Sequence, residues 1–87
     1  MNQTYQDISQ RHAIAHIVRK QSEPYMKSNK KTDHDQGRIL TNIADDIMAN
    51  DLQMACLRLD ALHYDIKTNL PFQVLDFLNK AELHLGS

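Results

Sequence analysis

The chain has few of the residues that mark disulfide-linked, zinc-binding and membrane proteins. It has one cysteine, Cys56, which excludes an intrachain disulfide and a paired-cysteine zinc site. No hydrophobic run approaches the roughly 20 residues of a membrane-spanning helix. The first residues, MNQTYQDISQRH, lack the charged start and apolar stretch of a secretory signal. We therefore expect a cytoplasmic protein in a reducing environment that does not enter a membrane.

Residues that interrupt helices are also scarce. The 87 residues include only two glycines and two prolines, and strand-forming residues do not alternate along the chain. A chain of this length is expected to form one domain, here residues 1–87. The sequence predicts an all-α fold, a small bundle of three long helices plus a fourth, short C-terminal helix.

The periodicity of apolar residues places these helices. The first covers about residues 4–22 and is expected to end near Ser22–Glu23, because the residue before Pro24 avoids helical dihedrals. A basic loop follows at about 25–35. The second covers about 36–49, the third 50–69, and the fourth begins at Pro71, a favourable residue for a first turn. The second carries the cleanest stripe: Ile39, Leu40, Ile43, Ala44, Ile47 and Met48.

Only Asn50-Asp51 separates the second predicted helix from the third. Asn50 is a candidate N-cap, and Asp51 suits the first turn of the next helix. A link this short favours an antiparallel hairpin with facing apolar stripes. No proline or glycine enforces the break, so one continuous bent helix is the alternative.

The third predicted helix has two apolar faces on a helical wheel. Its main stripe contains Leu52, Ala55, Cys56, Leu59, Leu62, His63 and Ile66. A second stripe contains Met54, Leu57, Ala61 and Tyr64. This second stripe is either buried against the helix that begins at Pro71 or exposed for a partner. Phe72 and Leu83 likewise fall outside the core stripe of the last helix. The predicted protein interface therefore comprises Met54, Leu57, Ala61, Tyr64, Phe72 and Leu83.

The charge is divided unevenly between the two halves of the chain. Residues 1–38 carry seven Lys and Arg against four Asp and Glu, or +3, and residues 39–87 carry three against seven, or −4, which together give the net −1. One basic cluster, broadly 19–31, contains Arg19, Lys20, Lys27, Lys30 and Lys31, with Tyr25 among them. Clustered cations with an aromatic residue suit nucleic acid. The alternative is a solvated loop, and no nucleic-acid-binding motif accompanies the cluster.

Residues with catalytic or metal-binding chemistry do not form a recognisable site. His12 and His16 are one helical turn apart, but a third ligand is missing nearby. The triplet Asp33-His34-Asp35 also lacks the further ligands of a metal phosphohydrolase. Cys56 is expected to pack in the core. We therefore expect no enzyme activity, no metal and no cofactor.

The missing chemistry and the surplus apolar residues together favour a regulatory or interaction protein. A domain of this size buries only about 60% of its surface and has a small stability margin. A homodimer that covers the second stripe would bury further apolar surface. The sequence therefore predicts a non-enzymatic adaptor or inhibitor that binds a protein partner as a homodimer, with nucleic-acid binding as the alternative.

Overall fold

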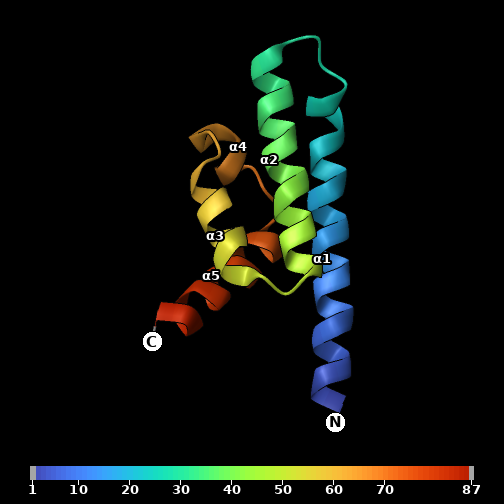
Figure 1. Cartoon of the computed structure of the whole chain (residues 1–87), viewed down its shortest axis with the longest axis vertical. Coiled ribbons are helices and arrows are strands. Elements are labelled where there is room, and N and C mark those ends of the chain that lie inside the picture. The colour runs from blue at the N-terminus through green and yellow to red at the C-terminus, as the bar shows by residue number, and fades with distance from the viewer. Residues whose placement is uncertain (1, 87) are drawn as a thin grey trace.

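The computed structural model describes residues 2–86 of the chain, and the side chains of residues 8–83. Residues 2–86 form five α-helices and no strand, which confirms the all-α class (Figure 1). The helices are α1 (Asn2–Met26), α2 (Lys31–Met48), α3 (Leu52–Asp60), α4 (Tyr64–Thr68) and α5 (Phe72–Gly86). Over this part of the chain, none of them is both long enough and apolar enough to cross a membrane.

Helices α1 and α2 form an antiparallel hairpin and lie side by side in Figure 1. The α2 stripe is buried as predicted, with Leu40, Ile43, Ala44 and Ile47 at most 1% exposed. They pack in one core with Ile14, Ala15 and Val18 of α1. Ile8 lies on the same side of α1 by helical spacing, but it is 41% exposed. The N-terminal part of α1 extends beyond the end of α2 (Figure 1).

The connection between α1 and α2 is shorter than predicted. α1 continues through Pro24 to Met26, and α2 begins at Lys31, so the expected loop at 25–35 is wrong at both ends. Pro24 lies in the last turn of α1 and, having no N–H, cannot donate the bond that another residue would make there. The half-buried Tyr25 packs against the core and holds that turn in place.

Ser28 organises the turn that remains. Its hydroxyl donates to Asp33 Oδ2 at 2.6 Å and accepts the Lys30 N–H at 3.1 Å. The N-cap of α2 is Lys30, whose side chain makes no capping bond. Asp33 lies in the first turn, where its charge suits the positive end of the helix dipole.

Helices α2 and α3 are separate, which excludes the single bent helix. Asn50 has a φ of 60°, a left-handed conformation that asparagine tolerates better than most residues. It therefore ends α2 and does not cap α3. Asp51 is the N-cap, and its Oδ1 accepts the Met54 N–H at 3.3 Å. α3 then runs back along α2 (Figure 1).

The stretch 50–69 is not one helix, so the fold has α3 and α4 where a single long helix was predicted. The break falls at Ala61, Leu62 and His63, where no proline or glycine is present. Leu62 turns into the core and is 6% exposed. The backbone N–H of His63 donates to Gln36 Oε1 of α2 at 2.8 Å. A contact with another helix therefore fixes the break.

Helix α5 completes the core with Val74 and Leu78, and Leu70 is buried just before it. It begins directly after Pro71, as predicted, and the Pro71 carbonyl accepts the Val74 N–H at 3.0 Å. It packs mainly against α3 and also against α1. Leu85, whose spacing also places it on the core side of this helix, lies outside the described side chains.

Candidate protein interface

One side of α3 is covered and the other faces solvent. Ala55 and Leu59 are buried, whereas Leu57 is 59% exposed and Met54 38% exposed. Ala61, at the C-cap, is exposed too. Met54, Leu57 and Ala61 are spaced i, i+3 and i+7, so they lie on one side of the helix, which we call the α3 outer face. The alternative in which this stripe packs against the helix after Pro71 is excluded.

Helix α5 contacts α3 on a different side. The thiol of Cys56 donates to the Leu78 carbonyl oxygen at 3.6 Å, which marks the line of contact between the two helices. Around the helix, Cys56 points about 100° away from Leu57 and about 160° away from Met54. α5 therefore leaves the α3 outer face uncovered.

The other predicted interface residues are also exposed. The exposed fractions are 77% for Tyr64, 79% for Phe72 and 76% for Leu83. Tyr64 opens α4, so it adjoins the end of the α3 outer face without continuing its stripe. Phe72 and Leu83 lie three turns apart on α5. The six residues were predicted as one interface, but they belong to two helical faces, one on α3 and one on α5.

Acidic residues flank the α3 outer face. Asp51, Asp60 and Asp65 are all exposed. The Asp60 carboxylate pairs with Lys67 Nζ at 3.1 Å but stays 65% exposed. Arg58, the basic residue within α3, is turned toward α2, where its Nε lies 2.7 Å from Asp46 Oδ2. The field over the α3 outer face is therefore set mainly by carboxylates.

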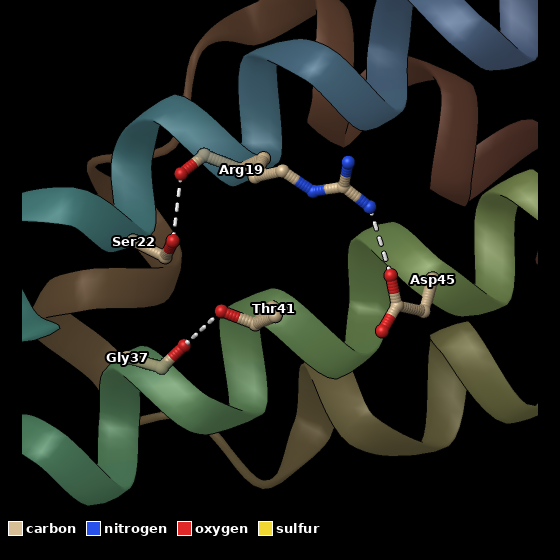
Figure 2. Close-up of polar contacts among 5 residues, drawn as sticks. All are labelled: Arg19, Ser22, Gly37, Thr41 and Asp45. Carbon is tan, nitrogen blue, oxygen red and sulfur yellow. Dashed lines mark hydrogen bonds and ion pairs between the residues drawn. The ribbon is translucent and has the colours of Figure 1, made fainter.

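Of the predicted nucleic-acid-binding residues, Arg19 and Tyr25 make contacts with other parts of the chain, and the four lysines are exposed. Figure 2 shows Arg19 of α1 reaching across to Asp45 of α2, with 2.8 Å between Nη2 and Oδ1. Tyr25 is half-buried and packs against the core. The lysines Lys20, Lys27, Lys30 and Lys31 are exposed. They share their end of the hairpin with Glu23, Asp33 and Asp35, which reduces the local positive charge.

Within the described side chains, one turn brings together a hydroxyl, a carboxylate and an imidazole. Ser28, Asp33 and His34 meet at the α1–α2 turn, but His34 Nε2 bonds to the Ser28 carbonyl oxygen and not to its hydroxyl. The hydroxyl instead donates to Asp33, so no base is placed to activate it. His12 and His16 are exposed. Across the described side chains, no cluster of three His, Cys, Asp or Glu residues suits a metal ion.

Burial raises the pKa of the Cys56 thiol, and the charges of Glu82 and Asp60 raise it further. A raised pKa keeps the thiol protonated near neutral pH, which makes it a poor nucleophile. Cys56 was expected to pack in the core, and it is half-buried and packs against the core.

One cleft was not predicted from the sequence. It lies between α1, the start of α3 and α5, has a volume of about 300 Å³, and is lined by Gln10, Leu52, Gln73, Asp76, Phe77, Lys80 and Ala81. Arg11 and Asn50 line its continuation. These residues come from three helices, so the periodicity of any one helix does not indicate the cleft.

Comparison with protein-family models, with curated proteins and with solved structures finds no significant match to this chain.

Proposed function

We propose that this chain is a non-enzymatic interaction protein, an adaptor or inhibitor, that binds a protein partner through the α3 outer face and acts as a homodimer. The observation that carries the proposal is the exposure of Leu57, at 59%, beside Met54 and Ala61 on the same side of α3. Contiguous exposed apolar side chains on a small domain are characteristic of binding surfaces. Methionine and aromatic residues are enriched in such surfaces.

The charges beside this face support a particular kind of partner. Asp51, Asp60 and Asp65 surround apolar side chains with exposed carboxylates. A partner with an apolar patch and neighbouring Lys or Arg residues matches both features, since complementary charge increases the association rate and opposes wrong partners. An amphipathic basic helix is one such partner.

The test compares binding by three forms of the full chain. In pull-downs from a lysate of the source organism, Leu57→Glu removes an apolar contact and adds a negative charge to the α3 outer face. Ile8→Glu, at a side chain 41% exposed on α1, is the matched control. We expect a protein that the wild type and Ile8→Glu retain and that Leu57→Glu loses at least about tenfold. Equal retention of the same proteins by all three forms would refute the proposal.

A further inference from the structure

We propose that the outer face of α5 is the homodimer contact, formed by two copies of α5 packed antiparallel about a two-fold axis. We define this outer face by Phe72, Asp76, Asn79 and Leu83, with Lys80 at its edge. Asp76 and Lys80 also line the cleft between α1, α3 and α5, which borders this face. The inference deepens the proposed function, since it takes the homodimer from it and assigns the dimer to α5, leaving the α3 outer face for the partner.

The residues of the α5 outer face share one side of the helix. Positions 72, 76, 79 and 83 are spaced i, i+4, i+7 and i+11, which keeps them within a narrow strip of an α-helix. Val74 and Leu78 lie on the other side and are at most 1% exposed. Phe72 and Leu83, at 79% and 76% exposed, therefore point away from the core at opposite ends of the strip.

The strip is complementary to a second copy of itself in both its apolar and its charged residues. Lys80 Nζ pairs with Asp76 Oδ2 within the same helix at 3.1 Å, and Lys80 is 75% exposed. Two midpoints fall at almost the same level of α5, beside Leu78. One lies between Phe72 and Leu83, and the other lies between Asp76 and Lys80. A two-fold axis at that level brings Phe72 of one copy to Leu83 of the other. It also brings Asp76 of each copy to Lys80 of the other, on the same flank of the helix pair.

The α5 outer face differs from the α3 outer face in its charges. Two copies joined through α3 would bring Asp60 of each copy toward an acidic flank of the other, and like charges oppose association. The α5 outer face presents one acidic and one basic residue on the same flank, so two copies exchange opposite charges there. Charge complementarity therefore favours a second copy on α5 and a basic partner on α3. A single helix pair is a small interface, so we expect a dimer of micromolar affinity.

The test is sedimentation equilibrium of the full chain over a range of concentrations. Asp76→Lys and Lys80→Asp each place like charges opposite one another across the axis, and we expect each to weaken the dimer about fivefold or more. An equimolar mixture of the two variants restores opposite charges, so we expect it to contain more dimer than the mean of the two variants alone. Asp65→Lys, an equal change of charge on α4, is the control and should leave the dimer unchanged.

Phe72→Ser provides a test that does not depend on charge, and we expect it to weaken the dimer while the helical circular dichroism stays at the wild-type value. A wild type that is monomeric at the highest concentration would overturn the α5 dimer. So would charge variants that have no effect, or a mixture that shows no recovery. Loss of the dimer on Leu57→Glu, with Asp76→Lys unaffected, would place the dimer on α3 instead. The pull-down with Leu57→Glu tests partner binding separately, because a monomer can still retain a partner through α3.

Discussion

The side-chain oxygen of Gln36 accepts a hydrogen bond from the backbone N–H of His63 at 2.8 Å, between α2 and the break that separates α3 from α4. Gln36 is 6% exposed, so this bond is largely shielded from water. The chain leaves α3 just before this point, which turns Leu62 into the core and sends α4 in a new direction. Removing the bond leaves a partly buried N–H without a partner.

We therefore expect Gln36→Ala to lower the free energy of unfolding by about 1–2 kcal/mol. Urea unfolding followed by circular dichroism measures this change. Gln53→Ala is the control, because Gln53 is exposed on α3 and its removal should change stability by less than about 0.5 kcal/mol. Equal stability of the two variants would show that the Gln36 bond does not hold the break.

Gly37 lies where α2 passes close to the end of α1. A Cβ at this position would be 3.1 Å from Tyr25 Cβ and 2.7 Å from Met26 Sδ. Met26 is flexible and exposed, but the Tyr25 Cβ is fixed to the backbone. We expect Gly37→Leu to lower the free energy of unfolding by about 1–3 kcal/mol, because the added side chain overpacks this contact. Arg38→Leu, at the adjacent exposed position, should remain near the wild type, and a similar loss in both variants would contradict this account.

Two ion pairs to adjacent carboxylates of α2 differ in burial. Arg58 pairs with Asp46, whose side chain is 16% exposed, whereas Arg19 and Asp45 are 54% and 61% exposed. Breaking the first pair leaves a carboxylate partly shielded from water, so Arg58→Ala should cost about 1–3 kcal/mol of stability. Arg19→Ala should cost at most about 1 kcal/mol. Chemical denaturation of both variants measures the two losses of stability. A larger loss for Arg19→Ala than for Arg58→Ala would contradict this account.

Cys56 couples stability to alkaline pH. Burial first, then the charges of Glu82 and Asp60, raise the pKa of its thiol above its ordinary value of 9.0. On raising the pH, the unfolded thiol ionises before the folded one, so the contribution to stability is complete below pH 9.0 and is lost above it. We expect Cys56→Ala to unfold with a smaller loss of stability between neutral and alkaline pH than the wild type. Identical pH profiles would show that the folded environment does not disfavour the thiolate.

Much of the fold follows from local sequence, because its determinants lie within single helices. The α2 stripe, the start of α5 after Pro71 and the break at Asn50-Asp51 all depend on residues close to each other in the chain. The division of 50–69 into α3 and α4 does not, since it is fixed by Gln36, a residue of another helix. The extension of α1 past Pro24 likewise depends on the packing of Tyr25.

The exposed residues of the candidate interface were all identified from helical periodicity, but their grouping was not. The wheel placed Tyr64 in line with Leu57 only because it assumed an unbroken helix. The relation of Phe72 and Leu83 to the α3 outer face depends on how α5 crosses α3, which a helix's own sequence does not specify. The cleft beside α5 was missed for the same reason, because its walls come from three helices.

Photo-crosslinking from position 57 tests the α3 outer face most directly. A photoreactive phenylalanine replaces Leu57 in one form of the chain expressed in the source organism, and Ile8 in a second form, and the crosslinked products are compared by mass. We predict a discrete adduct with one protein from position 57 that is absent from position 8, and that is lost when Met54→Glu is added. No adduct from position 57, or the same products from both positions, would contradict the assignment of this face as a protein interface.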